Sequence, residues 1–319
     1  MVDKKIIVTG ATGFVGQAFL KAAHEAGIGK LICFTTQPQH LISDSLKNLA
    51  QWITVDYLDQ AVMEAALVDS APDAIVHIAG AVRGTPKQLF ESNTLVSVVL
   101  CEAIQRVCPE AIVTHIGSAA EYGYPAIGND GVRLRIDDDT PYKPVGAYGH
   151  SKAAASAYFR DAEKRGLALN IVKPFNLIAP NNSPNQVVGS FFDKLKKSAE
   201  NNDENGLQVS MGHLGAVRDF ITLRDLVSCL IHLVRTGAAS HTINACSGEG
   251  HCIRDMLVRV CERNDLAVSI GEPNQGMEHG NDVIVGCPNR FKDTLPNRQL
   301  ISIDDVLDQS LKIALNSQK

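Results

Sequence analysis

Short apolar runs alternate with amphipathic stretches along the first half of the chain. Runs such as KKIIVT and AIVHIA have the length and β-branched content of buried strands, and the stretches between such runs carry helical spacing and good helix formers. The expected strands are residues 4–9, 30–35, 52–55, 74–79, 111–116 and 167–172, and the expected helices are 14–26, 60–68, 89–107 and 148–165. Repetition of strand, helix and strand implies right-handed crossovers and a parallel sheet covered on both faces. The pattern predicts a doubly wound α/β domain.

Beyond Pro174 the alternation gives way to a mixed pattern. Residues 179–186 and 200–206 are rich in Asn, Pro and Gly, which is typical of loops. The expected strands here are 209–220, 241–245 and 283–285, and the expected helices are 223–234, 253–263 and 303–315. We interpret residues 1–174 as the parallel-sheet domain and residues 175–319 as the last sheet elements interleaved with a small lobe.

The composition excludes several classes of protein. With 45% hydrophobic and 20% charged residues, the chain has enough apolar surface to fold, which excludes intrinsic disorder. There are 30 Lys and Arg against 35 Asp and Glu, and the net charge of −5 speaks against a nucleic-acid partner. No apolar run approaches the ~20 residues that a membrane span needs, so we expect no membrane partner.

The start of the chain and its cysteines are typical of a cytoplasmic protein. Residues 1–5 lead into too few apolar residues for the core of a signal peptide. The eight cysteines form no CxxC pair and have no regular spacing, so we expect reduced thiols rather than disulfides or a zinc site. No cluster of His, Asp and Glu has the spacing of a metal site, and we predict that no metal is bound.

A glycine-rich turn follows the first expected strand. The segment TGATGFVG places Gly10, Gly13 and Gly16 between that strand and the first helix. These glycines allow a tight turn, a close approach of backbone to a pyrophosphate, and close packing of helix on strand. The helix N-terminus adds free N–H groups for the phosphates. The turn predicts dinucleotide binding, although a turn of this kind can also serve packing alone.

The end of the second strand bears on which dinucleotide is bound. An acid at this place would hold the ribose 2′-hydroxyl of NAD, but the strand ends in CFTTQ, with Thr35 and no carboxylate. The missing acid permits a 2′-phosphate, yet no arginine stands there to bind that phosphate. We expect the cofactor to be NADP or NAD, with a slight preference for NADP.

Several polar residues have two interpretations each. Asp56, after the third strand, could reach the adenine amino group or could cap a turn or helix. Asn93, early in a helix, could brace the backbone of the site or face solvent. His77 and His115 lie within strands, and we expect hydrogen-bonded core histidines there rather than ligands.

A tyrosine and a lysine stand four residues apart at the start of a predicted helix. Tyr148 and Lys152 therefore share one helical face, one turn apart. A nearby ammonium would favour the phenolate and lower the pKa of Tyr148, which would suit a general acid or base. Ser118 follows the strand at 111–116, where the carboxyl end of a strand meets the crevice of an open α/β sheet. YxxxK alone is common, but the glycine turn, this serine and YxxxK in this order form a far more specific pattern.

In the order of its motifs the chain resembles the extended short-chain dehydrogenase/reductase superfamily, in its nucleotide-sugar epimerase/dehydratase branch. The similar segments are TGATGFVG at 9–16, HIAG at 77–80, GSAAEYG at 117–123, PYKPVGAYGHSK at 141–152, KPFNLIAP at 173–180 and RDFITLRDL at 218–226. The resemblance implies a Rossmann domain for NAD(P), a lobe for a nucleotide-sugar substrate, and a homodimer formed through helices at 93–107 and 148–165.

The resemblance also implies a catalytic triad. Ser118 would hydrogen-bond the sugar oxygen, Tyr148 would transfer its proton, and Lys152 would hold the nicotinamide ribose. The residues expected at the cofactor are Gly10, Thr12, Gly13, Phe14, Val15, Gly16, Thr35, Asp56, Tyr57, Ala79, Gly80, Ala81, Asn93, Tyr148, Lys152 and Phe175.

Three further residues are expected to contact the substrate besides Ser118. Asn176 would donate to the diphosphate, and Arg218 would pair with a phosphate or with the nucleoside. Arg83 would face the sugar pocket. Two of these have structural alternatives, because Arg218 could form an ion pair with Asp219 and Arg83 could lie in a solvated loop.

The absence of two residues from this sequence reduces the number of family reactions that it could catalyse. Family dehydratases carry an acid two residues before the tyrosine of the YG pair, and that position is Ala120. Glu121 comes one residue later, which in an extended segment points to the opposite side. Epimerase-reductases with a Cys/His pair carry a histidine where Gln186 stands. Reduction of a 4-keto group and epimerisation at C4 remain, and the missing ribose acid favours reduction.

Several segments are most similar to reductases of GDP-4-keto-6-deoxymannose, with departures such as Lys173 in place of arginine and Ala179 in place of glycine. We therefore expect an NAD(P)-dependent reductase of a nucleoside-diphospho-4-keto-6-deoxysugar. One alternative is a nucleotide-sugar 4-epimerase with tightly bound NAD. The other is a non-catalytic dinucleotide-binding regulator, which would need none of the three triad residues.

Overall fold

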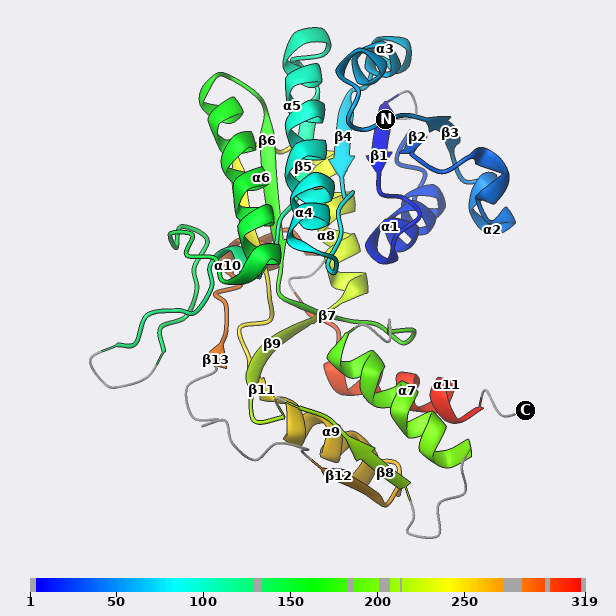
Figure 1. Ribbon diagram of the computed structural model, residues 1–319, viewed down its shortest axis with the longest axis vertical. Coiled ribbons are helices and arrows are strands. Elements are labelled where there is room, and N and C mark those ends of the chain that lie inside the picture. The colour runs from blue at the N-terminus through cyan, green and yellow to red at the C-terminus, as the bar shows by residue number, and fades with distance from the viewer. Residues whose placement is uncertain are drawn as a thin grey trace.

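A seven-stranded parallel sheet forms the upper half of the molecule in Figure 1. The computed structural model describes residues 4–128, 133–182, 186–200, 207–212, 214–271, 283–295 and 299–316. The sheet has the strand order β10-β6-β5-β4-β1-β2-β3, formed by β1 Lys5–Thr9, β2 Lys30–Thr35, β3 Gln51–Thr54, β4 Ala74–His77, β5 Ile112–Ile116, β6 Leu169–Pro174 and β10 His241–Ala245. The strand order reverses between β1 and β4, and ligands bind at such switch points in open α/β sheets.

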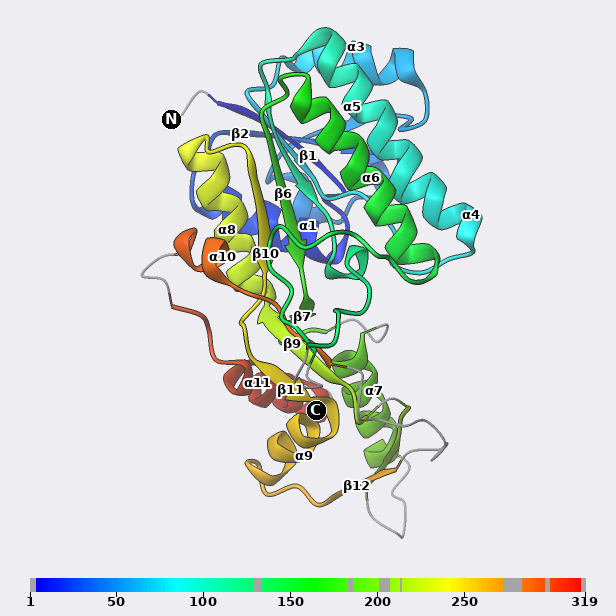
Figure 2. The same cartoon turned by 90° about the vertical axis from the view of Figure 1, so that its left-hand side faces the viewer.

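Helices cover both faces of this sheet, as Figures 1 and 2 show. The helices on one face are α3 Gln60–Ser70, α5 Val96–Val107 and α6 Gly146–Lys164, and those on the other are α1 Phe14–Glu25, α8 Leu223–Thr236 and α10 Asn289–Asp293. Successive strand residues point to opposite faces, so Ile6 and Val8 pack toward α1 and α8 while Ile7 packs toward α3 and α5. The predicted doubly wound α/β fold is confirmed.

The helix predicted at 89–107 is interrupted. It consists of α4 Pro86–Leu89, a π-helical turn Phe90–Leu95 and α5. Thr85 caps α4 and Pro86 occupies its first turn, where proline is well tolerated. Such π turns often occur at functional sites, and this one contains Asn93.

The lower half of Figure 1 is a smaller lobe. Its sheet consists of β7 Asn176–Ile178, β9 Val217–Thr222, β11 Gly250–Cys252 and β13 Val283–Ile284, and a second pair consists of β8 Leu207–Ser210 and β12 Val268–Gly271. Three helices pack on these strands: α7 Val187–Glu200, α9 Ile253–Glu262 and α11 Ile303–Asn316. Phe191, Phe220, Leu257 and Leu307 are fully buried at their shared core.

The prediction of one strand over residues 209–220 is wrong. The chain forms β8 and β9 instead, and these pair with different partners, β12 and β7 respectively. Gly212 and Gly215 lie between the two strands, where glycines let the chain bend out of one sheet and into another.

The remaining elements are short: η1 Gln39–Leu41, α2 Asp44–Lys47 and η3 Ala119–Glu121. All eight cysteines are free thiols. Within the described ranges no helix is long and apolar enough to cross a membrane, and no three His, Cys, Asp or Glu side chains are grouped to hold a metal ion.

Candidate active site

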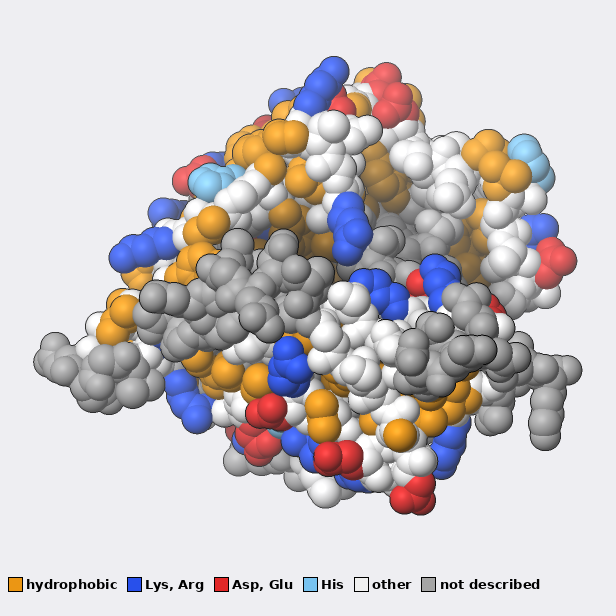
Figure 3. Space-filling view, turned by 60° about the horizontal axis from the view of Figure 1, so that its bottom comes forward, with side chains coloured by type: hydrophobic (Ala, Val, Ile, Leu, Met, Phe, Trp, Pro, Cys, Tyr) orange, Lys and Arg blue, Asp and Glu red, His pale blue; other side chains and the backbone are white. Residues whose placement is uncertain are grey.

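A cleft of about 890 Å³ opens at the carboxyl ends of β1, β2, β4 and β5, at the switch point of the sheet. In the space-filling view of Figure 3 the surface is hollowed near the middle of the molecule, and Lys and Arg side chains stand at the rim of the hollow. A cleft of this volume is large enough for a dinucleotide together with part of a second ligand.

The glycine turn forms the floor of the cleft. Gly10 has a φ of +72°, and a Cβ at this residue would lie 2.6 Å from the backbone nitrogen of Ala79. Only glycine therefore fits between β1 and β4 at this point. The turn residues that line the cleft are Gly10, Thr12, Gly13, Phe14 and Val15. Gly16 is predicted at the cofactor but is not part of the cleft wall; it packs beneath the turn, where a Cβ would clash with the carbonyl oxygen of Gly10.

Most other residues predicted at the cofactor also line the cleft. They are Thr35, Asp56, Tyr57, Ala79, Gly80, Ala81 and Asn93. Asp56 additionally accepts the backbone N–H of Leu58, so it stabilises a turn as well as facing the cleft. The ring of Phe175 is buried against Tyr122 and Ile136 and does not line the cleft, so its contact with the cofactor stays a prediction. It follows β6 directly, and the alternation of side chains along the chain turns it away.

Asn93 braces the wall of the cleft. Its side chain is 1% exposed, and Oδ1 accepts the backbone N–H of Ala81 at 2.7 Å while Nδ2 donates to the carbonyl of Ala81 at 2.9 Å. Nδ2 also donates to Oγ of Ser151 in α6. Of the two interpretations of Asn93, the structure shows the bracing one, since this amide ties the loop after β4 to the helix that carries Tyr148.

The three predicted catalytic residues lie together. Tyr148 and Lys152 lie on the cleft side of α6, and both line the cleft. Ser118 follows β5 and its side chain is hydrogen-bonded to Tyr148. Nζ of Lys152 donates to the carbonyl of Ile116 at 2.6 Å, so the lysine also holds the end of β5.

Burial controls the protonation of these groups. It raises the pKa of Tyr148, an effect that Glu121 reinforces and the hydrogen bond with Ser118 opposes. The expectation that Lys152 lowers the pKa of Tyr148 is therefore wrong for this structure, in which the ammonium is directed to Ile116. Burial lowers the pKa of Lys152 to about 8, and Glu121 opposes this decrease. At neutral pH Tyr148 is a protonated phenol that can donate a proton.

Three of the four predicted substrate residues, Ser118, Asn176 and Arg218, are not among the residues that line the cleft. Asn176 in β7 donates from Nδ2 to the carbonyl of Asp219 at 2.8 Å, so its amide joins two strands of the lobe. Arg218 in β9 donates from Nη1 to the carbonyl of Val217 at 3.0 Å. The pairing of β7 with β9 brings the amide of Asn176 to the backbone of β9.

The carboxylate of Asp219 is bound by the loops beside it. It accepts hydrogen bonds from the backbone and hydroxyl of Ser247 and from the backbone of Gly248 and Gly286. These contacts connect β9 to the loops after β10 and β13, and they explain why an acid is buried at this position.

Arg83 and Gln186 approach the cleft from two sides. Arg83 is exposed and lines the cleft beside Val82, and its contact with the sugar stays a prediction. Gln186 lines the cleft just before α7, and its Oε1 is buried without a hydrogen-bond partner among the described residues. The sequence drew attention to Gln186 only as a missing histidine, because nothing in a loop rich in Asn and Pro shows where a glutamine points.

His77 and His115 are buried side by side beneath Lys152, with ring centroids 5.3 Å apart. His77 is hydrogen-bonded to Oγ1 of Thr9 and Oγ of Ser97, as expected of a core histidine. His115 differs from the expectation, since neither ring nitrogen has a hydrogen-bond partner within the described part of the chain. Burial lowers the pKa of His77 to about 3 and that of His115 well below its usual value, so both rings are neutral.

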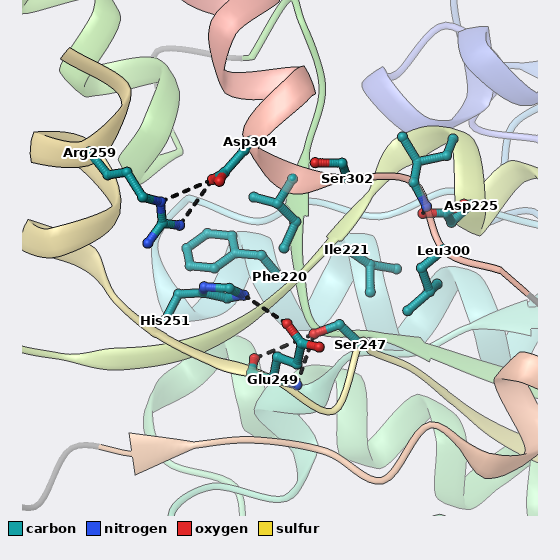
Figure 4. A pocket seen from close by; sticks show the side chains of 12 residues that line it. Phe220, Ile221, Asp225, Ser247, Glu249, His251, Arg259, Leu300, Ser302 and Asp304 are labelled. Carbon is teal, nitrogen blue, oxygen red and sulfur yellow. Dashed lines mark hydrogen bonds and ion pairs between the residues drawn. The ribbon is translucent and has the colours of Figure 1, made fainter. Parts of the chain in front are cut away.

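A second cavity, of about 270 Å³, lies in the lobe between β9, β11, α9 and the start of α11. Figure 4 shows Arg259 bonded to Asp304 on one side of it, and His251 between Phe220 and Glu249 on the other. It shares no lining residue with the cleft and contains none of the glycine turn, Ser118, Tyr148 or Lys152. The cleft is therefore the candidate active site.

Residues 6–246 match the model of the NAD dependent epimerase/dehydratase family. The chain belongs to this family. It is an enzyme of the extended short-chain dehydrogenase/reductase type, and NAD(P) is the cofactor typical of the family.

The individual relatives share only a low sequence identity with this chain. The chain is 26% identical over 326 residues to GDP-6-deoxy-D-mannose reductase of Pseudomonas aeruginosa, covering 99% of this chain and 97% of the relative. Its fold is similar to RMD from Pseudomonas aeruginosa complexed with NADPH, with a TM-score of 0.75, 22% identity and coverage of 98% and 99%. It is also similar to UDP-glucose 4-epimerase of Thermus thermophilus complexed with NAD, with a TM-score of 0.78, 20% identity and coverage of 98% and 99%.

Proposed function

We propose that the protein is an NAD(P)-dependent reductase of nucleoside-diphospho-4-keto-6-deoxysugars, of the GDP-6-deoxymannose type. The observation that carries the proposal is the hydrogen bond between Ser118 and a protonated Tyr148, beside buried Lys152, in a cleft with a dinucleotide-type glycine turn. The similarity to GDP-6-deoxy-D-mannose reductase over nearly the whole chain supports the choice of substrate class.

The residues of the cleft fit a nicotinamide dinucleotide. The turn at Gly10 leaves no side chain between backbone and phosphate, and the N-terminus of α1 presents its first N–H groups at the same place. Thr35 and Thr36 line the cleft at the end of β2, where a carboxylate would repel a 2′-phosphate. We infer a preference for NADPH from the absence of an acid in the sequence at this strand end.

The side chains of the chain would carry out a carbonyl reduction. The glycine turn and Lys152 would hold a reduced nicotinamide dinucleotide, which when bound would provide the hydride for the carbonyl carbon. Tyr148, whose pKa is raised by burial, donates its phenol proton to the carbonyl oxygen, and Ser118 hydrogen-bonds the same oxygen. Lys152, whose ammonium donates to the carbonyl of Ile116 in this structure, would hold the ribose of the bound coenzyme. Ser118 and Tyr148 are already joined, so the proton donor is oriented before substrate binds.

The position of Glu121 supports reduction over dehydration. Dehydration needs an acid in the cleft beside the sugar, but the position that carries it in family dehydratases is Ala120. Glu121 is fully buried below the cleft and pairs with Lys173 at 3.1 Å. Its carboxylate is therefore withdrawn from the substrate.

Gln186 and Arg83 are proposed to contact the sugar and its diphosphate. A carboxamide donates and accepts hydrogen bonds but does not transfer protons, so Gln186 would orient the sugar without epimerising it. Gln186 lines the cleft and its buried Oε1 has no hydrogen-bond partner among the described residues, so this carboxamide keeps an unsatisfied acceptor next to the cleft.

The proposal is tested by mixing the protein with NADPH or NADH and a panel of nucleoside-diphospho-4-keto-6-deoxysugars while following the absorbance of the reduced nicotinamide. We expect oxidation with one member of the panel and loss of at least about a hundredfold in kcat for Tyr148→Phe. Silence across the panel, with isomerisation of an unmodified nucleotide sugar and NAD retained through purification, would instead establish a 4-epimerase. Coenzyme binding that Tyr148→Phe leaves unchanged, without turnover of any nucleotide sugar, would support a non-catalytic regulator.

A further inference from the structure

A fully buried ion pair lies directly below the candidate active site. Oε2 of Glu121 is 3.1 Å from Nζ of Lys173, and both side chains are 0% exposed. The ammonium also lies over two tyrosine rings, 3.6 Å from the centroid of Tyr142 and 4.3 Å from that of Tyr122. A buried ion pair costs several kcal/mol of desolvation per ion and is often no more stabilising than an apolar pair, so stability alone does not account for it.

The pair is connected to the active site through the backbone of Ser118. Oε1 of Glu121 accepts the N–H of Ser118 at 2.7 Å. The preceding residue is glycine by necessity, since a Cβ at Gly117 would clash with Oε1 of Glu121 and lie 3.1 Å from Cγ of Lys173. On the cleft side, Lys152 holds the carbonyl of Ile116. The segment that presents Ser118 is thus held from below by a carboxylate and from above by the lysine of the cleft.

Glu121 is the acidic group that interacts with the ammonium of Lys152. The titratable groups around Lys152 are His77, His115 and Glu121, which interact with it electrostatically, and Tyr148, one helical turn away in α6. Both histidines and the tyrosine are neutral at pH 7, which leaves Glu121 as the carboxylate acting on this ammonium. The groups that face Lys173 and its rings are Glu121, Tyr122, Tyr142, Arg160 and Asp138.

We propose that Glu121 and Lys173 form a positioning unit for the active site, which fixes Ser118 through its backbone N–H and supplies the negative charge that balances the ammonium of Lys152. The inference deepens the proposed function and rests on it, because Ser118 and Lys152 matter to catalysis only if the cleft binds nicotinamide and a sugar. Glu121 and Lys173 touch neither ligand and act through their neighbours.

The charge of Glu121 shifts the pKa values of two active-site groups in a direction that can be measured. It raises the pKa of Lys152 and the pKa of Tyr148. Removing the charge lowers both. Lys152 and Tyr148 act in their protonated forms, so turnover and coenzyme binding are lost as the pH rises through their pKa values. When Glu121 is replaced by a neutral residue, the alkaline limb of the pH profile therefore moves to lower pH, both for turnover and for coenzyme binding.

The test uses the Glu121→Gln variant and the Glu121→Gln/Lys173→Met double variant. Glutamine retains an oxygen for the N–H of Ser118 and loses only the charge, and the double variant avoids leaving Lys173 buried without a partner. Asp225→Asn is the matched control, because Asp225 is a buried acid in the first turn of α8, away from the cleft, where it accepts a hydrogen bond from the hydroxyl of the N-cap residue Thr222. The dissociation constant of NADPH, by fluorescence titration, and kcat/KM are measured between pH 6 and 10.

We expect the alkaline limb of both variants to move down by about one pH unit, with NADPH affinity at pH 9 about tenfold below the parent. Asp225→Asn should lower the stability of the fold but leave the alkaline limb of the pH profile in place. Lys173→Arg keeps a cation opposite Glu121 and should therefore retain the pH profile of the parent. A double variant that folds and follows the parent at every pH would overturn this inference alone. A parent protein that binds no reduced nicotinamide would overturn the proposed function and this inference together.

Discussion

At the scale of single residues, buried amides and ions hold the cleft in shape. Asn93 makes two hydrogen bonds to the backbone of Ala81 and one to Ser151, and all three connect elements that surround the cleft. A buried hydrogen bond that loses one partner leaves the other unsatisfied, at a cost of about 1–3 kcal/mol. The cleft wall therefore depends on Asn93, whose polar atoms bond to the protein itself.

Asn93→Ala should weaken NADPH binding about tenfold or more, because the loop that carries Gly80 and Ala81 loses its brace. Thr94→Ala is the matched control. It removes one hydrogen bond from the neighbouring side chain to the carbonyl of Ser151 and leaves Ala81 untouched. The measurement is a fluorescence titration with reduced coenzyme. Equal affinities for the two variants would contradict a specific role for Asn93.

At the scale of elements, the carboxyl end of β2 is expected to select the coenzyme. Thr35 is buried, lines the cleft and accepts the backbone N–H of Gln37 at 3.0 Å. Aspartate at this position can accept the same N–H and would place a carboxylate against a 2′-phosphate.

Thr35→Asp should therefore weaken NADPH binding by about tenfold or more while NADH binding holds or improves, because the new charge repels the 2′-phosphate alone. Thr35→Asn, which has the same shape without the charge, is the control and should retain the preference of the parent. The ratio of the two dissociation constants is the quantity to compare. A Thr35→Asp variant with an unchanged ratio would show that β2 does not select the coenzyme.

The elements also show where sequence patterns succeed and where they stop. Strand β2 coincides with its predicted bounds, because a buried parallel strand is a continuous apolar run bounded by polar residues. The bounds of β10 are also as predicted. The π turn at Phe90–Leu95 has no periodic signature, so it is hidden inside a good helical pattern. The apolar content of 209–220 likewise gives no sign that β8 and β9 join different sheets.

At the scale of the whole molecule, two neutral histidines in the core should make stability depend on pH. Burial lowers the pKa of His77 to about 3 and lowers that of His115 as well, whereas an unfolded histidine has a pKa near 6.5. Below pH 6.5 the unfolded chain therefore binds protons that the folded chain does not. The free energy of unfolding should fall by about 1.4 kcal/mol per histidine for each pH unit below 6.5.

His115→Phe should remove about half of this acid sensitivity. The ring lies 4.7 Å from that of Phe159 and makes no hydrogen bond within the described residues, so phenylalanine can take its place with little loss at pH 7.5. Denaturant unfolding at pH 7.5, 6.5 and 5.5 gives the slope of the unfolding free energy against pH for the parent and for the variant. Parallel slopes for parent and variant would mean that His115 does not titrate on unfolding.

Sequence reasoning reached the fold and the meeting of Ser118, Tyr148 and Lys152, because strand order and helical spacing place these residues at one sheet edge. The contacts of Asn176 and Arg218 with substrate stay predictions, since the directions of these side chains depend on how β7 and β9 pair in the lobe. Sequence reasoning failed to join Glu121 to Lys173, since no local pattern shows that residues on β6 and η3 share a buried space. The homodimer through 93–107 and 148–165 stays a prediction.

The most direct test of the account follows the hydride. The protein is supplied with NADPH that carries deuterium at the reactive C4 position, together with the nucleoside-diphospho-4-keto-6-deoxysugar that the panel identifies. We predict one deuterium per product sugar, bound to the former carbonyl carbon, with one NADPH oxidised per product and with the reaction abolished in Tyr148→Phe. A product without deuterium, or sugar isomers that interconvert with no net oxidation of NADPH, would contradict the proposed reductase.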